Sequence, residues 1–244
     1  MNEGWVATRL GLQGWPNVAE SSFVARDVQL AELTRARLHV AHVSTGASVE
    51  LVRRARQAGL PVTCEATPHH LTLTDEEVAR SGYDTRFKMN PPLRSEADRA
   101  ALVEALADGT IDAIATDHAP HHRDEKALEF ADAPFGVTGL ETALPVLLDA
   151  LVATRLVSLT RLVEALTIGP ARAFGLPAGT LREGAPADVV LFSASRPTTF
   201  GPGAFRSRSQ NSPWLGRTLR GRVERTWVDG REVHRRPAAE SEGA

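Results

Sequence analysis

The chain has 244 residues, of which 42% are hydrophobic and 24% charged, and its formal net charge is −2. This composition is that of a globular protein with a sizeable core, and the balanced charge excludes a dedicated nucleic-acid or anionic-membrane surface. No apolar run approaches the ~20 residues that span a bilayer. The single Cys64 excludes an internal disulfide, so a reducing, cytoplasmic location is expected.

The first twenty residues lack the basic and apolar segments of a secretory signal and predict a loop that carries several Gly and Trp residues. Further on, strand-like runs alternate with helical patterns, which predicts parallel α/β structure. Ser48 is the expected N-cap of the first helix, and Ser95 with Asp98 begins the third. The expected strands are 37–43, 60–67 and 111–116, and the expected helices are 46–59, 74–82 and 95–109.

The last third of the sequence changes character. Helical patterns at 139–153 and 159–174 are followed by a Gly- and Pro-rich stretch, and then by a strand at 187–192 and a hairpin signal around Val228-Asp229-Gly230-Arg231. The chain is therefore divided into an α/β part, a small β domain and a disordered tail. Their expected ranges are 1–176, 177–236 and 237–244.

Chemistry-bearing residues lie at the ends of all three predicted strands: His42 at the first, His69 and His70 after the second, and Asp117 after the third. In parallel α/β folds the active site lies at the carboxyl ends of the strands. Alternation along the strands predicts that His42 and Asp117 point into one cavity, with Ala113 and Ala115 leaving room behind the acid. A neutral imidazole and a carboxylate are ligands of catalytic zinc, and such a carboxylate can also accept a proton from water.

Each of these residues also has a plainer explanation. Taken alone, His42 is a hydrogen-bonded core histidine, Asp117 caps a turn, and Asn90 before two prolines is a turn residue. The pair His69 and His70 is expected to be structural, with one ring buried and one exposed. A solvated loop accounts for at least one of three further histidines, His118, His121 and His122.

Longer motifs are more specific than the single residues. The segments "HVAHVSTGASVEL", "VTCEATPHHLTLTDEE", "KMNPPLRSEADRAALVEALADGTIDAIATDHAPHHRDEK" and "APFGVTGLETALP" resemble the dihydroorotases of the bacterial multidomain-related type, within the amidohydrolase superfamily. The resemblance implies an α/β fold that forms part of a metal-dependent (β/α)8 barrel, followed by a small C-terminal β domain. It covers the chain to about residue 234.

The resemblance also implies roles for individual residues. His42 corresponds to a metal ligand, and Asp117 to a residue that is both metal ligand and general acid/base. The family holds two metal ions, with Zn²⁺ the expected cofactor. The histidines of "PHHL" are not ligands in this pattern. Substrate contacts are implied for Asn90, His121, Phe135 and Gly136.

The implied activity is the reversible hydrolysis of the cyclic amide of dihydroorotate to N-carbamoyl-L-aspartate, an early step of pyrimidine biosynthesis. Two alternatives stay open. One is another cyclic amidase of the superfamily, such as an allantoinase or a hydantoinase. The other is a non-catalytic dihydroorotase-like subunit that stabilises a partner, for instance an aspartate carbamoyltransferase. The protein partners expected of the chain are a second copy of itself or an aspartate carbamoyltransferase.

The sequence departs from the family pattern in one large respect. The family's first strand carries a His-x-His pair and a nearby arginine, and later strands add a bridging acid or modified lysine and a further histidine; none of these is found here. A complete barrel needs about 250 residues. We therefore expect three of eight barrel strands, two of about six metal-ligating positions, and an N-terminally truncated form that is inactive alone.

Overall fold

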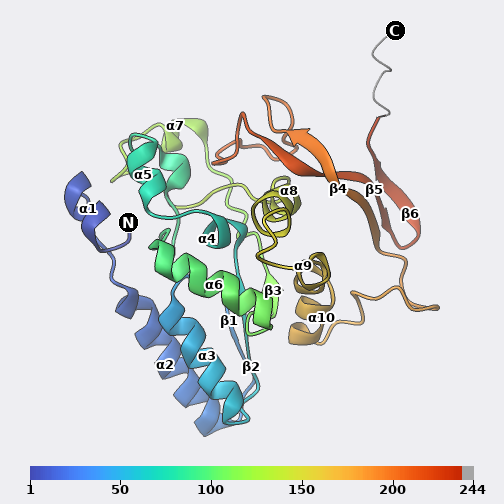
Figure 1. Cartoon of the computed structure of the whole chain (residues 1–244), viewed down its shortest axis with the longest axis horizontal. Helices are drawn as coiled ribbons and strands as arrows, with labels where there is room; N and C mark the ends of the chain where they lie inside the picture. The colour runs from blue at the N-terminus through green and yellow to red at the C-terminus, as the bar shows by residue number, and fades with distance from the viewer. Residues whose placement is uncertain (238–244) are drawn as a thin grey trace.

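The computed structural model describes residues 1–237 and contains two sheets, one parallel and one antiparallel (Figure 1). Of the tail predicted at 237–244, only Pro237 lies within the described residues. The parallel sheet has the order β1-β2-β3 and the antiparallel sheet the order β4-β5-β6. The strands are β1 Leu38–Val40, β2 Val62–Ala66, β3 Ala113–Ile114, β4 Val189–Thr199, β5 Thr218–Val228 and β6 Arg231–Arg235.

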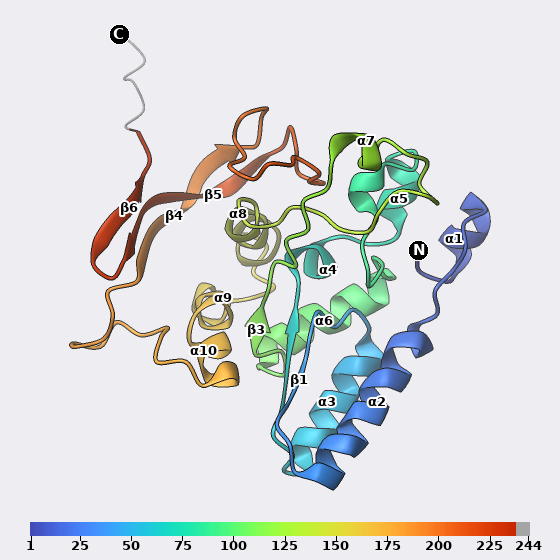
Figure 2. The ribbon, with the colours of Figure 1, turned by 180° about the vertical axis from the view of Figure 1, so that it is seen from behind.

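Helices lie against one face of the parallel sheet, and further helices lie between it and the antiparallel sheet (Figures 1 and 2). Before β3 they are α1 Trp5–Leu10, α2 Asn17–Thr34, α3 Gly46–Gln57, α4 Pro68–Thr72, α5 Glu76–Arg80, the 3-10 turn η1 Thr85–Phe87 and α6 Glu96–Asp108. After β3 they are α7 Arg123–Lys126, α8 Ala143–Leu147, the π-helical turn η2 Leu148–Val152, α9 Leu159–Leu166 and α10 Ile168–Phe174.

The parallel sheet confirms the predicted strand–helix alternation, although each strand is shorter than expected. Leu38 pairs with Val62, and Glu65 pairs with Ala113, in parallel register. The three strands do not close into a barrel. Within residues 1–237, β1 and β3 each pair with β2 alone, so both outer edges of this sheet are open.

One face of the parallel sheet packs against helices. The side chains of Val62, Cys64, Ala66 and Ile114 belong to the main core cluster together with leucines of the helices. Burial of each leucine contributes about 2 kcal/mol. The fully buried leucines of this core are Leu71, Leu102, Leu106, Leu147, Leu148, Leu151 and Leu162.

Helix ends agree only in part with the sequence prediction. Ser95 caps α6 as expected, because its hydroxyl accepts the N–H of Asp98 at 3.2 Å. The predicted cap Ser48 is wrong. Thr45 caps α3 instead, and its hydroxyl accepts the N–H of Ser48 at 3.2 Å, since the helix begins earlier than the apolar pattern.

Two other predictions are corrected. The loop expected over the first twenty residues contains α1 and the beginning of α2, and α2 packs beside α3 with Val24 and Ala31 buried. The helix expected at 159–174 is interrupted at Thr167. There the backbone of α10 approaches β3 so closely that a Cβ on Gly169 would lie 2.1 Å from the Asp112 carbonyl oxygen.

The antiparallel sheet contains the predicted hairpin. Asp229 and Gly230 both have positive φ, as the tightest hairpin turns require. The sheet packs on α8 through a second apolar cluster, so contacts cross the predicted boundary near residue 176, and that boundary stays a prediction. The cluster comprises Val146, Phe200, Phe205, Trp214 and Leu219. Among residues 1–237, no helix is both long and apolar enough to cross a bilayer.

Candidate active site at the carboxyl ends of the parallel strands

The residues that directly follow the carboxyl ends of β1 and β3, which we call the exits of these strands, are hydrogen-bonded to β2. The N–H of Val43 donates to the carbonyl of Glu65 at 2.9 Å, and the N–H of Ala115 donates to the carbonyl of Ala66 at 3.1 Å. Because β2 lies between them, two strand spacings separate these exits, or about 10 Å. His42 and Asp117 therefore leave the same edge of the sheet from strands that are not direct neighbours.

Both residues have a left-handed backbone. The φ angles are 36° at His42 and 47° at Asp117. Such a conformation costs a non-glycine residue about 1–2 kcal/mol and is concentrated at functional sites. The strands end at Val40 and Ile114, so strict alternation stops before either residue. Alternation was thus the wrong basis for expecting both side chains in one cavity.

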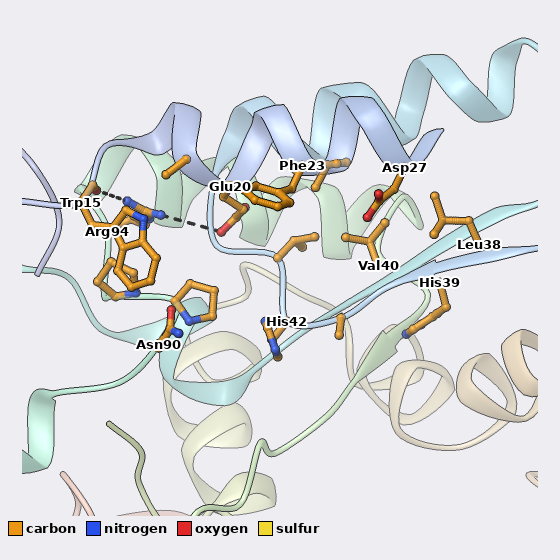
Figure 3. A pocket seen from close by; sticks show the side chains of 16 residues that line it. Trp15, Glu20, Phe23, Asp27, Leu38, His39, Val40, His42, Asn90 and Arg94 are labelled. Carbon is orange, nitrogen blue, oxygen red and sulfur yellow. Dashed lines mark hydrogen bonds and ion pairs between the residues drawn. The ribbon is translucent and has the colours of Figure 1, made fainter. Parts of the chain in front are cut away.

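His42 and Asn90 line one cavity of about 390 Å³ between α2 and β1 (Figure 3). Its walls include the apolar side chains of Phe23 and Val40. Asn90 is exposed and is joined to Pro91 by a cis peptide bond. Of the residues predicted to form the site, the structure brings these two to one cavity.

A buried histidine fixes the loop that carries Asn90. The Nε2 of His70 lies 2.9 Å from the carbonyl oxygen of Pro91, and its Nδ1 lies 2.8 Å from the hydroxyl of Thr67. Burial lowers the pKa of His70 to about 4. The ring of His70 is therefore neutral at pH 7 and holds the loop by hydrogen bonds.

His69 is buried as well, so the expected exposed ring of the pair is wrong. Burial, with His70 and His42 close by, lowers the pKa of His69 well below its ordinary value. Among residues 1–237, the enclosed Nε2 of His69 and Nδ1 of His42 find no hydrogen-bond partner. Two imidazole nitrogens without a hydrogen-bond partner among residues 1–237 thus lie near the carboxyl ends of β1 and β2.

An acidic residue of α2 anchors the other side of the same exit. The carboxylate of Glu20 accepts the N–H of Ser44 at 3.1 Å and the N–H of Thr45 at 3.1 Å, and both hydroxyls also donate to it. Arg94, 3% exposed, donates from Nε to the Ser44 hydroxyl at 3.0 Å. It also donates from Nη1 to the Trp15 carbonyl at 2.7 Å, and Figure 3 shows it beside Glu20. The segment after His42 is therefore held by hydrogen bonds from both Glu20 and Arg94.

A second group of predicted site residues lies together at the loops after β3. Gly136 has a φ of 124°, and a Cβ there would lie 2.5 Å from the Cβ of Ala119 and 3.1 Å from the Nε2 of His121. Only glycine fits this approach. The ring of Phe135 is 46% exposed and lies 4.8 Å from the Nζ of Lys88. His121 and the Phe135–Gly136 peptide are thus brought together.

The other two histidines of this loop have structural contacts. The Nδ1 of His118 accepts the N–H of Gly139 at 3.1 Å, and its Nε2 lies 3.3 Å from the hydroxyl of Ser207. His122 caps α7, accepting the N–H of Asp124 at 3.3 Å. These contacts agree with the expectation that the three histidines do not all serve catalysis.

His42 and Asp117 are suitable metal ligands, but two ligands alone are too few to hold a catalytic metal ion. The enclosed, unpartnered Nδ1 of His42 and the exposed carboxylate of Asp117 are suitable donors. Catalytic zinc, however, takes three protein ligands. In the part of the chain that the structure describes, no three His, Cys, Asp or Glu side chains lie close enough to hold a metal ion.

Several residues of this region were not predicted from the sequence. Lys88 and Lys126 are the only lysines of the chain, and that rarity is the one signal that pointed to them. Both are buried, and burial lowers the pKa of Lys126 to about 8. No local pattern marks the remaining contributors, which come from distant parts of the chain. They are Glu20, Arg94, Ser207 and Asn211.

Polar side chains gathered at the carboxyl exits of parallel strands, with helices on the outer face, define the class of barrel-type α/β enzymes. Within that class, residues 18–233 match the amidohydrolase family, and the chain belongs to this family. Its members are metal-dependent hydrolases.

Curated relatives and solved structures agree with this assignment. The chain is 57% identical over 240 residues to the dihydroorotase of Anaeromyxobacter dehalogenans, a match that covers 98% of this chain and 55% of the relative. It is 54% identical over 235 residues to the dihydroorotase of Syntrophotalea carbinolica, covering 96% and 55%. The chain therefore spans about half the length of the curated relatives that it matches.

Two solved structures share the fold. The L-hydantoinase (dihydropyrimidinase) from Arthrobacter aurescens superposes with a TM-score of 0.83 and 34% identity over 88% of this chain and 48% of that one. The dihydropyrimidinase from Brevibacillus agri superposes with a TM-score of 0.83 and 26% identity over 90% and 49%. The parallel sheet and the antiparallel sheet thus occur together in proteins of known structure.

Proposed function

We propose that this chain carries part of the active site of a dihydroorotase, which opens the ring of dihydroorotate to N-carbamoyl-L-aspartate and closes it again. One observation supports this function most strongly. His42 and Asp117 leave β1 and β3 at the same edge of the sheet, both with a left-handed backbone, and Asn90 shares the cavity of His42. The identity to dihydroorotases over nearly the whole chain supports the same substrate.

His42 and Asp117 supply two ligands to a metal site, for which we propose Zn²⁺, and the remaining ligands come from outside residues 1–237. When bound, the metal polarises the ring carbonyl and lowers the pKa of the attacking water. The free edges of β1 and β3 support association with a further polypeptide, either a second copy of the chain or an aspartate carbamoyltransferase. The unpaired, buried Cys64 supports a reducing, cytoplasmic location.

Other steps of the proposed reaction, proton transfer and substrate binding, are assigned to residues of this chain. Asp117 accepts a proton from the attacking water and returns it to the ring nitrogen as the carbon–nitrogen bond of the amide breaks. Water thus adds across one bond, and no other reactant is needed. Asn90, His121 and the Phe135–Gly136 peptide hold the polar edge of the substrate, where fixed donors also stabilise charge that develops in the transition state.

The test uses the chain alone and the chain fused to the part of the Anaeromyxobacter dehalogenans relative that lies outside the match. Each is assayed with zinc for N-carbamoyl-L-aspartate formation. We expect activity in the fusion, and a loss of at least ~100-fold in Asp117→Asn. Asp124→Asn, an exposed acid of α7, is the matched control and is expected to retain activity.

A substrate panel separates dihydroorotate from the alternatives. Hydantoin, dihydrouracil and allantoin are the competing cyclic amides. Faster turnover of any of them than of dihydroorotate overturns the proposed substrate. A fusion that binds zinc and turns over none of the four substrates overturns the proposed catalysis and favours a non-catalytic subunit.

A further inference from the structure

Asn211 connects the loops that carry His121 and Gly136. It lies between β4 and β5 in the sequence and is 5% exposed. Its Nδ2 donates to the carbonyl of Ala119 at 3.0 Å and to the carbonyl of Gly136 at 3.0 Å. Its Oδ1 accepts the N–H of His121 at 3.3 Å. One side chain therefore bonds to the main chain of both loops.

The main chain of Asn211 extends this contact. Its carbonyl accepts the N–H of Thr138 at 3.1 Å, two residues beyond Gly136. Its side-chain oxygen also accepts the hydroxyl of Ser209. The amide group is thus fully engaged, with both donors and its acceptor used. No carboxylate, hydroxyl or apolar side chain of this size offers two donors and an acceptor together.

The two lysines also bond to the loop that carries Gly136. The Nζ of Lys126 donates to the carbonyls of Gly136 at 3.1 Å and Pro134 at 3.0 Å. The Nζ of Lys88 donates to the carbonyls of Ala133 at 2.6 Å and Ala131 at 2.8 Å. The Gly136 carbonyl therefore receives one donor from Asn211 and one from Lys126, which fixes the orientation of its peptide.

The two loops, one with Ala119 and His121 and the other with Gly136, are packed so closely that they cannot shift relative to each other without steric clashes or broken hydrogen bonds. The Cα of Gly136 faces Ala119 and His121 at a distance that excludes any side chain. The N–H of Gly136 donates to the carbonyl of Lys88 at 2.9 Å, and the N–H of Ala119 donates to the carbonyl of Val137 at 2.9 Å. Loss of the Asn211 amide would leave two carbonyls and one N–H of this junction without that partner, which is costly in a buried position.

We propose that Asn211 is a positioning residue that sets the separation of His121 from the Phe135–Gly136 peptide, with Lys126 as the second donor to Gly136. Asn211 acts through these loops and not by direct contact with the reacting atoms. That the separation serves substrate binding rests on the proposed function. The positioning itself rests on the contacts of this chain alone.

The first arm of the test measures loop order without a ligand. Asn211→Leu removes the amide at nearly constant size, and Gln210→Leu, the adjacent exposed amide, is the matched control. Hydrogen–deuterium exchange of the Ala119, Gly136 and Thr138 amides is compared among the variants. We expect exchange at least ~10-fold faster in Asn211→Leu and unchanged in the control. Equal exchange in both overturns the positioning role.

A milder variant covers the case in which Asn211→Leu does not fold. Asn211→Asp retains the acceptor for the N–H of His121 but loses both donors. It is expected to speed exchange at Ala119 and Gly136 more than in core helices such as α6. Uniform acceleration over the whole chain would show a general loss of stability and would overturn the proposal.

The second arm measures the affinity for N-carbamoyl-L-aspartate by calorimetry with zinc present. We expect about tenfold weaker binding in Asn211→Leu and no change in Gln210→Leu. Faster loop exchange with unchanged affinity overturns the substrate part of the proposal. If the unsubstituted chain does not bind this ligand, the affinities are compared in the fusion, where absence of binding overturns the proposed function. The exchange arm then still decides whether Asn211 positions the loops.

Discussion

The Oε2 of Glu20 and the Nη2 of Arg94 lie 3.9 Å apart beneath the exit of β1, with the hydroxyl of Ser44 bonded to both side chains. Burial raises the pKa of Glu20, but the hydrogen bonds from Ser44 and the charge of Arg94 more than offset it, so the pKa is lowered. The carboxylate is therefore ionised at neutral pH and faces a buried guanidinium.

Removal of one partner of this pair should be costly. Arg94→Met removes the buried guanidinium that faces the half-buried carboxylate of Glu20 and bonds to Ser44 and Trp15, and we expect a loss of about 3–5 kcal/mol in the free energy of unfolding. Urea denaturation measures it. The exposed pair Arg9–Glu76, 3.3 Å apart, is the matched control, and Arg9→Met is expected to cost less than about 1 kcal/mol. Equal losses in the two variants would contradict the structural role of Arg94.

Acid should destabilise the protein through His70. In the unfolded chain this histidine takes up a proton near pH 6.5, whereas burial delays protonation in the folded chain to about pH 4. The unfolded state binds more protons in this window, so stability falls as the pH is lowered from 6.5 to 4, by up to about 3 kcal/mol from this group. Urea midpoints against pH should show a shallower slope in His70→Gln than in the unsubstituted chain.

Cys64 should be unreactive in the folded protein. Burial raises the pKa of its thiol to about 12, so the nucleophilic thiolate is scarce. We expect a disulfide reagent to label it at least ~100-fold more slowly in buffer than in denaturing urea. Since it is the only cysteine, the labelling rate reports directly on opening of β2. Rapid labelling without denaturant would contradict the packing of the parallel sheet.

Gly136 should not tolerate a methyl group. Gly136→Ala imposes an unfavourable backbone conformation and brings a Cβ to 2.5 Å from Ala119, so we expect a loss of more than about 2 kcal/mol and faster exchange of the Ala119 amide. Gly82 also has a positive φ, of 66°, but open space around it. Gly82→Ala therefore measures the cost of a left-handed alanine without a steric clash, expected near 1 kcal/mol. A similar cost for both variants would contradict the close approach.

The elements of the fold that depend on a local sequence pattern or on a motif could be predicted from the sequence. Strand–helix alternation indicated the parallel sheet, Ser95 with Asp98 indicated the beginning of α6, and Asp229-Gly230 indicated the hairpin. The helices before residue 35 were missed, because α2 is only weakly amphipathic and its Val24 and Ala31 become buried only through tertiary packing.

The motifs supplied candidate residues for the site, and these assignments stay predictions, but the motifs did not predict the local geometry. His42, Asn90 and His121 were identified from motifs, yet alternation could not predict the left-handed backbone at His42 and Asp117, because it depends on how each strand ends. Glu20, Arg94 and Asn211 act over sequence separations of 24 to 92 residues. A pattern within one segment cannot predict such contacts, because the two partners lie in different segments.

The bonds of Asn211 have a consequence for how this architecture can change over evolution. The segment between β4 and β5 carries a side chain, that of Asn211, that is bonded to the main chain at Ala119, His121 and Gly136. The antiparallel sheet is therefore not an interchangeable module. A recombination that exchanged residues 189–235 with those of a distant relative would preserve the loops only if it brought an equivalent amide to the same point, so the two halves of the chain must be inherited together.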